Sequence, residues 1–245
     1  ADLHRRARQV AQRLERDGFA LGDRVATLAW ITARHLEVWY GAMGMGAIYH
    51  TLNPRLFPQQ IAWIMNDAKD GILFADLTFM PLVEKIAPLV KSLKKVIVLT
   101  DGQHMPETAL DNVVAYEDWL AEADGDYRWK TLDENAACGM CYTSGTTGDP
   151  KGVVYSHRSN VLHAMIAVQP DAMGISSRDV ILPVVPMFHA NAWGLAQSAP
   201  MIGSKLVMPG GKMDGPSIYE LLDTENVTFT AAVPTVWLML LQHLE

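Results

Sequence analysis

The chain has 245 residues, of which 49% are hydrophobic and 19% charged, and its net charge is −7. This length suits one large domain or two small ones, and the composition excludes a disordered chain and a coiled coil. The acidic balance argues against a dedicated nucleic-acid binder, and the 2 cysteines exclude a disulfide scaffold. The apolar stretches fall short of the about 20 residues that span a bilayer, and no signal-peptide pattern opens the chain. We therefore expect a soluble, cytoplasmic globular protein.

Short apolar runs alternate with segments of helical periodicity along the whole chain. Helical spacing predicts helices over 3–14, 32–43, 59–67, 77–93, 116–120, 159–167, 193–199, 217–223 and 235–244. Apolar runs rich in branched residues predict strands over 24–29, 47–51, 71–74, 96–99, 136–142, 153–155, 180–182, 205–207 and 228–231. This alternation predicts an α/β fold, with parallel-sheet layers and helices on both faces. The polar stretch 124–132 suggests a boundary between two subdomains.

The segment 142–152, Tyr-Thr-Ser-Gly-Thr-Thr-Gly-Asp-Pro-Lys-Gly, combines four serine and threonine hydroxyls, three glycines and one lysine. Glycines let backbone N–H groups approach an anion, the hydroxyls add donors, and Lys151 adds a mobile charge. These groups can surround a polyphosphate; the alternative is a polar loop that holds no ligand. The segment is not a Walker loop, and Gly44 and Gly46 lack the third glycine of a dinucleotide fingerprint. We expect the loop to be mobile until a nucleotide binds.

This loop resembles the phosphate-binding signature of the AMP-forming adenylate synthetases, which include acyl-CoA synthetases, luciferases and peptide-synthetase adenylation domains. The segments 46–56 (Gly-Ala-Ile-Tyr-His-Thr-Leu-Asn-Pro-Arg-Leu), 186–194 (Pro-Met-Phe-His-Ala-Asn-Ala-Trp-Gly) and 232–235 (Ala-Val-Pro-Thr) resemble the same family. The resemblance covers essentially the whole chain and implies part of the family's large N-terminal domain. It implies a first α/β subdomain portion over 1–130, a phosphate-loop and acyl-pocket portion over 131–245, and an absent C-terminal lid domain.

The resemblance implies an acyl-CoA synthetase that uses ATP, magnesium and coenzyme A. In that reaction a carboxylate attacks the α-phosphate of ATP, pyrophosphate leaves, and the acyl-adenylate transfers its acyl group to coenzyme A. The resemblance implies a catalytic role for Lys151 at the departing pyrophosphate and places Thr143 near magnesium. The implied nucleotide contacts are Thr143, Ser144, Gly145, Thr146, Thr147, Gly148 and Lys151. The acid is expected to be short- to medium-chain or fatty; a narrower alternative is a 3-methylmercaptopropionate-CoA ligase, which segments 51–56 and 188–193 also resemble.

His189 is the second candidate catalytic residue, because Phe188-His189 matches the family segment that borders the acyl and adenylate sites. A histidine can donate a hydrogen bond to a carboxylate oxygen. Trp193 follows four residues later and would share a helical face with His189 if the helix has begun, so both are expected to contact the acid. The alternative for His189 is a satisfied core histidine, and the alternative for Trp193 is simple packing.

Other patterns carry no site. Cys138 and Cys141 have C-x-x-C spacing but lie in a predicted strand, where they would point to opposite faces. No Gly-x-Ser-x-Gly or His-Glu-x-x-His motif is present. His157 follows the phosphate loop and is expected only to support it. The arginines of the first helix are expected to form a solvated surface.

Two other classes of function remain open on sequence grounds: a nucleotide- or acyl-binding module without turnover, and a purely structural domain. The resemblance covers only the first half of the family pattern, so the 245-residue chain alone is expected to be inactive. The apolar segment 235–244 is expected to leave an exposed patch through which the chain self-associates. The expected partners are therefore the acid, ATP and coenzyme A, without nucleic acid.

Overall fold

The computed structural model describes residues 2–143 and 149–245. The chain forms two compact units, one of Ala1–Ala29 with Ala33–His157 and one of Trp30–Thr32 with Arg158–Glu245. Each unit has its own sheet and is described by itself. The boundary lies beyond the position near 130 expected from composition, because the strands on both sides of the glycine-rich loop belong to the first sheet.

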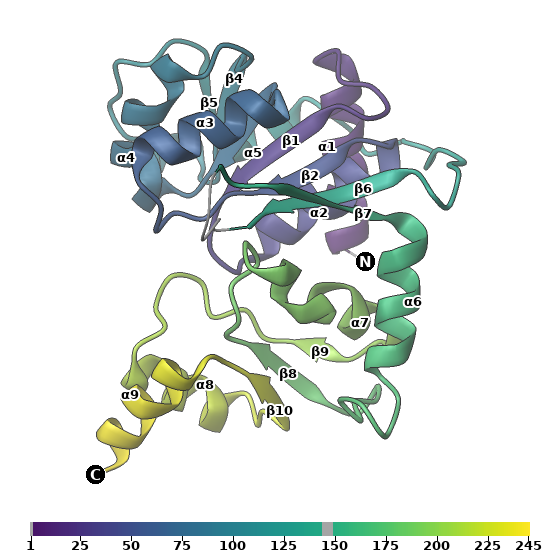
Figure 1. Ribbon diagram of the computed structural model, residues 1–245, viewed down its shortest axis with the longest axis vertical. Coiled ribbons are helices and arrows are strands. Elements are labelled where there is room, and N and C mark those ends of the chain that lie inside the picture. Colours follow the sequence, from purple (N-terminus) through teal and green to yellow (C-terminus); the bar gives the residue numbers. More distant parts are fainter. Residues whose placement is uncertain (1, 144–148) are drawn as a thin grey trace. The chain divides into compact units, whose positions relative to one another are not determined.

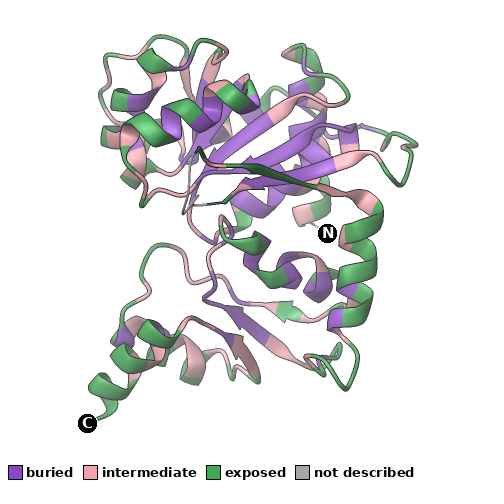
Figure 2. Ribbon diagram, in the orientation of Figure 1, coloured by how far each residue is buried: buried purple, intermediate pink, exposed green. Residues whose placement is uncertain are grey.

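Within the described residues, the first unit contains a sheet of seven strands in the order β5-β4-β3-β1-β2-β6-β7 (Figure 1). The strands are β1 (Arg24–Leu28), β2 (Ile48–Thr51), β3 (Ile72–Ala75), β4 (Lys95–Val98), β5 (Val113–Ala115), β6 (Ala137–Tyr142) and β7 (Gly152–Ser156). Neighbouring strands are parallel except for β6 and β7, which pair antiparallel across the loop. The inner strands are buried, whereas β7 is largely exposed at the sheet edge (Figure 2).

Helices cover both faces of this sheet. They are α1 (Asp2–Arg16), α2 (Ala33–Met45), α3 (Pro58–Ala68), α4 (Met80–Ile86) and α5 (Tyr116–Ala121), with short turns η1 (Leu77–Phe79), η2 (Ala87–Leu89) and η3 (Gly102–His104). On one face, Trp39 of α2 stacks on Tyr49 of β2 with ring centroids 4.2 Å apart. On the other face, α3 and α4 bury apolar side chains against β1, β3 and β4. The expected α/β fold with a mostly parallel sheet is therefore confirmed.

The arginines of α1 form the expected solvated surface only in part: Arg5 and Arg16 are exposed, whereas Arg6 and Arg13 are not. Arg6 donates from Nε to Glu37 at 2.8 Å and from Nη2 to Glu117 at 3.0 Å. Arg13 is only 8% exposed and pairs with Asp17 and Glu122. The expectation was therefore wrong for Arg6 and Arg13, because acidic side chains distant in sequence fold against these two residues.

The second unit has its own three-stranded parallel sheet, within the described residues, in the order β10-β8-β9. Its elements are α6 (His157–Ala167), β8 (Val180–Pro183), η4 (Ala190–Gly194), α7 (Leu195–Ile202), β9 (Lys205–Leu206), α8 (Gly215–Thr224), β10 (Phe229–Ala231) and α9 (Pro234–Leu244). A small core joins β8 to Ile218 of α8 and Val236 of α9. Helix α9 leaves Leu238, Leu241 and Leu244 more than half exposed. The expected exposed apolar segment is confirmed, and self-association through it stays a prediction.

Two local expectations were wrong. The helix predicted over 77–93 is divided into η1, α4 and η2, and Pro81 and Pro88 are the second residues of α4 and η2. Proline has no N–H and therefore favours helix starts over helix interiors. Strand β5 was not predicted, because it has only three residues and carries no periodicity of its own.

No helix among the described residues is both long enough and apolar enough to cross a membrane.

Candidate nucleotide and acyl site

The glycine-rich loop leaves the first sheet at the end of β6 and returns to it at the start of β7. At its base the Thr143 N–H donates to the Lys151 carbonyl at 3.0 Å, and the Lys151 N–H donates to Thr143 Oγ1 at 3.3 Å. These two bonds bring together the first and last of the predicted nucleotide contacts. The predicted contacts between them, and the expected mobility of the loop, lie outside the described residues: Ser144, Gly145, Thr146, Thr147 and Gly148.

The side chains of Thr143 and Lys151 are both exposed. Among the described residues, the Lys151 ammonium has no ion-pair partner, so it is available to an anion. The Thr143 hydroxyl is an oxygen ligand of the kind magnesium prefers. No group of three or more His, Cys, Asp or Glu side chains in the described part of the chain is placed so that it could hold a metal ion.

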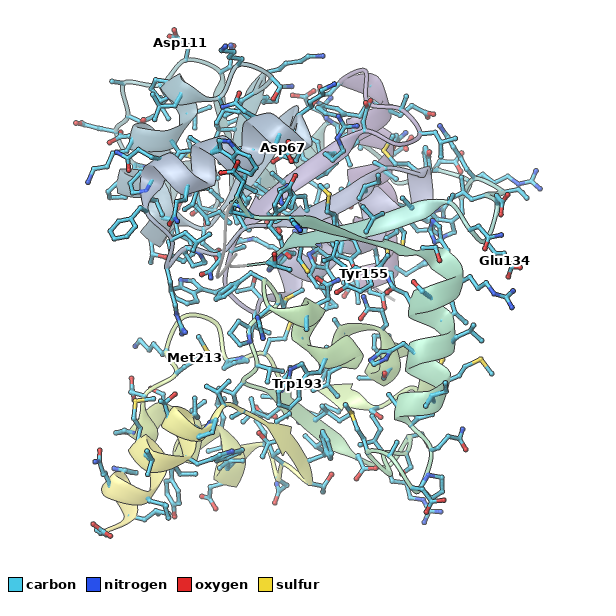
Figure 3. The ribbon with its side chains drawn as sticks, in the orientation of Figure 1. Asp67, Asp111, Glu134, Tyr155, Trp193 and Met213 are labelled. Atoms are coloured by element: carbon cyan, nitrogen blue, oxygen red, sulfur yellow. The ribbon has the colours of Figure 1, made fainter. Side chains whose placement is uncertain are left out.

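Tyr142, directly before Thr143, anchors the base of the loop, and sequence reasoning did not single it out. Its hydroxyl donates to Asp67 Oδ2, 75 residues away, at 2.6 Å. Asp67 is labelled in Figure 3 and lies near the end of α3. Asp67 belongs to no motif, so no sequence signal could have linked it to the loop.

His157 lies where β7 gives way to α6. Its backbone N–H donates to the Ala136 carbonyl at 3.1 Å, which ties the end of β7 to the start of β6. Burial lowers the pKa of the His157 imidazole, and its Nε2 atom is buried without a hydrogen-bond partner among the described residues. This placement agrees with a supporting role for His157.

His189 and Trp193 belong to the second unit, and both side chains are exposed; Trp193 is labelled in Figure 3. The chain between them does not form a right-handed helix. Residues 190–193 have φ between 44° and 54°, and Gly194 follows with φ 74°. The helix has therefore not begun at these residues, and the condition under which His189 and Trp193 would share a helical face is not met, because that spacing rule requires right-handed φ/ψ values.

This left-handed turn is held by neighbours within its own unit. His163 of α6 places Nε2 3.2 Å from the Trp193 carbonyl oxygen. The Ser198 hydroxyl donates to the Gly194 carbonyl at 2.9 Å. A Cβ at Gly194 would lie 2.5 Å from Cδ2 of His163, so the imidazole ring would have to shift to admit any residue other than glycine. His163, which has no motif of its own, thus contacts the segment predicted to border the acid.

A polar cavity of about 320 Å³ lies elsewhere in the first unit, where the chain enters β1, β3 and β4. Its lining includes Arg24, Lys69, Lys91 and Lys94 and none of the predicted site residues. The cavity therefore gives no support to the predicted site.

The two cysteines of β6 serve packing. Both are buried, and neither is in a disulfide. The Cys141 sulfur lies 3.7 Å from the Tyr155 hydroxyl, and the Cys138 thiol faces the Tyr155 carbonyl at 3.5 Å. Their burial in a strand agrees with the structural interpretation of the C-x-x-C spacing.

The model of one protein family, described as AMP-binding enzyme, matches residues 1–245. The chain belongs to this family. Its loop, its β6–β7 hairpin and its 186–194 segment are therefore features of an AMP-binding enzyme.

The chain is similar to curated acyl-CoA ligases. It is 49% identical over 245 residues to a long-chain-fatty-acid–CoA ligase of Thermus thermophilus, covering 100% of this chain and 44% of the relative. It is 46% identical over 231 residues to a 3-methylmercaptopropionyl-CoA ligase of Ruegeria pomeroyi, covering 94% and 43%. The chain thus spans less than half the length of the curated relatives it matches.

The fold is also similar to that of solved structures. An acyl-CoA synthetase of Brucella canis matches with a TM-score of 0.86 at 20% identity, covering 99% of this chain and 43% of that one. At this identity the likeness concerns the fold alone, and it confirms the adenylate-forming synthetase fold.

Proposed function

We propose that this chain is part of an AMP-forming acid–thiol ligase, which activates a carboxylic acid with ATP and transfers the acyl group to coenzyme A. The observation that carries the proposal is the closed base of the glycine-rich loop. There the Lys151 backbone N–H donates to the Thr143 hydroxyl, and the exposed Lys151 side chain has no ion-pair partner in the described part of a chain that belongs to the AMP-binding enzyme family. The identities with two acyl-CoA ligases support the acid–thiol class over luciferase-like chemistry.

In the proposed reaction the loop binds the β- and γ-phosphates of ATP. Charge grows on pyrophosphate as it leaves, so a preset cation stabilises the transition state more than the ground state. Lys151 is the catalytic residue proposed for this task, with hydroxyl and N–H donors from Thr143, Ser144, Thr146 and Thr147. Gly145 and Gly148 let the backbone approach the phosphates. Magnesium, when bound with ATP, would neutralise phosphate charge beside Thr143.

The acid is proposed to bind beside the left-handed turn of the second unit. His189 offers a hydrogen bond to the carboxylate or the adenylate, and Trp193 offers an apolar wall for the acyl chain. Both side chains are exposed, as a contact with substrate requires. We propose a short- to medium-chain or fatty acid; the 46% identity with a 3-methylmercaptopropionyl-CoA ligase favours a sulfur-containing small acid as the specific alternative.

A cytoplasmic location and the absence of a nucleic-acid partner remain part of the proposal. The net charge of −7 supports the second point, since nucleic acid attracts basic surfaces.

The proposed function is tested with a protein that carries this chain and has the length of its relatives. A panel of acids, including fatty acids of graded length and 3-methylmercaptopropionate, is incubated with ATP, magnesium and coenzyme A. We expect AMP, pyrophosphate and an acyl-CoA in equal amounts for at least one acid. ATP binding without acid-dependent pyrophosphate release would instead indicate a binding module, and no effect of ATP on melting would indicate a structural domain.

A further inference from the structure

Tyr142 contacts both stems of the glycine-rich loop. It is the last residue of β6 and stands opposite Gly152, the first residue of β7, in the antiparallel register. A Cβ at Gly152 would lie 3.2 Å from Cζ of Tyr142 and 3.4 Å from its hydroxyl oxygen. The tyrosine ring therefore covers the backbone of Gly152 at the point where the chain has just left Lys151.

The hydroxyl of Tyr142 ties this ring to α3. It donates to Asp67 Oδ2 at 2.6 Å, a short hydrogen bond to a carboxylate. Burial and the Asp67 carboxylate both raise the pKa of Tyr142, so the hydroxyl keeps its proton and remains a donor at neutral pH. The position of the ring is thus fixed by an element outside the hairpin.

A buried hydrogen bond between a histidine and a carboxylate lies next to the same ring. The His50 and Tyr142 ring centroids are 5.2 Å apart. His50 Nδ1 lies 2.9 Å from both carboxylate oxygens of Asp70, and neither side chain is exposed at all. His50 is therefore held in one orientation, and it gives Tyr142 a fixed neighbour on the face of the sheet that α3 covers.

We propose that Tyr142, held by Asp67, is a positioning residue that fixes Thr143 and Lys151 for the transfer of the adenylyl group from ATP to the acid, with pyrophosphate leaving. This inference rests on the proposed function. Tyr142 itself touches no reacting group; it sets the spacing of the two stems from which Thr143 and Lys151 project. A displacement of catalytic groups by about 1 Å can cost about 10²-fold in rate. A residue that fixes the positions of Thr143 and Lys151 should therefore affect the rate of adenylation.

The experiment compares Tyr142→Phe and Asp67→Ala with wild type in a protein that carries this chain at the length of its relatives. Single-turnover acid-dependent adenylation gives a rate constant per active site that does not depend on the folded fraction. We expect both variants to lose about 10-fold in this rate constant, with an unchanged KM for the acid. Asp67→Asn, which keeps an acceptor oxygen, is expected to retain most of the rate.

Tyr155→Phe is the matched control. Tyr155 lies on β7 of the same hairpin, is labelled in Figure 3, and has its hydroxyl 3.7 Å from the Cys141 sulfur. We expect wild-type kinetics for this variant. A wild-type rate constant for Tyr142→Phe and Asp67→Ala in an active enzyme would overturn the inference, as would an equal loss in Tyr155→Phe.

A second measurement needs no activity and separates this inference from the proposed function. The Thr143 amide is bonded across the loop base to the Lys151 carbonyl, so its hydrogen exchange reports how firmly the stems are joined. We expect about 5-fold faster exchange of this amide in Tyr142→Phe and unchanged exchange in Tyr155→Phe. Unchanged exchange in Tyr142→Phe would overturn the inference even if the enzyme is a ligase, and faster exchange would support it even if no acid is turned over.

Discussion

The segment proposed to bind phosphate, in the first unit, and the segment proposed to bind the acid, in the second unit, have opposite kinds of backbone structure. The base of the glycine-rich loop continues a regular strand pair, and its backbone bonds join Thr143 to Lys151. The 189–194 segment instead carries four consecutive residues other than glycine in the left-handed region. That conformation costs about 1–2 kcal/mol per residue, so it persists only where surrounding contacts impose it.

This difference predicts which property, catalysis or local folding, a substitution in each segment should change. Strand pairing tolerates most side chains, so changes at the loop base should alter phosphate chemistry more than folding. The left-handed turn depends on contacts from His163 and Ser198, so changes there should alter both the local structure and the acid site.

Lys151→Ala should slow adenylation by about 2–4 kcal/mol in activation free energy, because the ammonium meets charge that grows on pyrophosphate. The melting temperature should stay near that of wild type, since Lys151 is exposed and its side chain is unpaired among the described residues. Acid-dependent ATP–pyrophosphate exchange measures the rate in a protein of the relatives' length. Lys85→Ala, in α4, is the control, and an unchanged rate for Lys151→Ala would remove Lys151 from the mechanism.

His189→Ala and Trp193→Ala should change the ranking of acids by about 1–3 kcal/mol in kcat/KM, while the KM for ATP stays unchanged. Each removes hydrogen-bonding or apolar surface from the segment proposed to border the acid. The acid panel described above provides the measurement. If both variants keep the wild-type ranking and rates, the acid binds elsewhere.

Gly194→Ala should destabilise the second unit more than Gly203→Ala does. Both glycines have positive φ, 74° and 77°, so each substitution carries the conformational cost of about 1–2 kcal/mol. Only at Gly194 would the new Cβ also meet His163, at 2.5 Å, whereas nothing lies within 4 Å at Gly203. Overpacking adds about 1 kcal/mol or more, and urea unfolding of the two variants measures the difference. Equal midpoints would show that His163 yields without cost and does not hold the turn.

His157 should make stability fall slightly in mild acid. Burial lowers the pKa of this imidazole in the folded chain, so below about pH 6.5 the unfolded chain binds more protons than the folded one. The free energy of unfolding should therefore be fully retained above that pH and decrease as the pH falls. His157→Asn should flatten this dependence in urea titrations between pH 7 and pH 5. An identical slope in wild type and variant would mean that His157 titrates alike in both states.

The sequence alone predicted those elements that are specified by the composition or periodicity of their own residues. Apolar runs such as 136–142 and 180–182 became β6 and β8, because residues buried on both faces of a parallel sheet must be apolar. The glycine–hydroxyl composition of 142–152 identified the loop, since few other chemistries need those residue types together. Helical periodicity likewise located α1 and α3, whose buried faces repeat along the sequence.

Tertiary structure alone decided the contacts that cross the sequence. Asp67 meets Tyr142 only because α3 folds against the face of the sheet on which the Tyr142 ring lies. The turn at 190–193 is left-handed although residues 193–199 read as a helix start, because contacts from α6 and α7 outweigh the local preference of the backbone. Such contacts join residues far apart in the chain. The local sequence around each residue does not indicate its distant partner, so only the folded chain reveals these contacts.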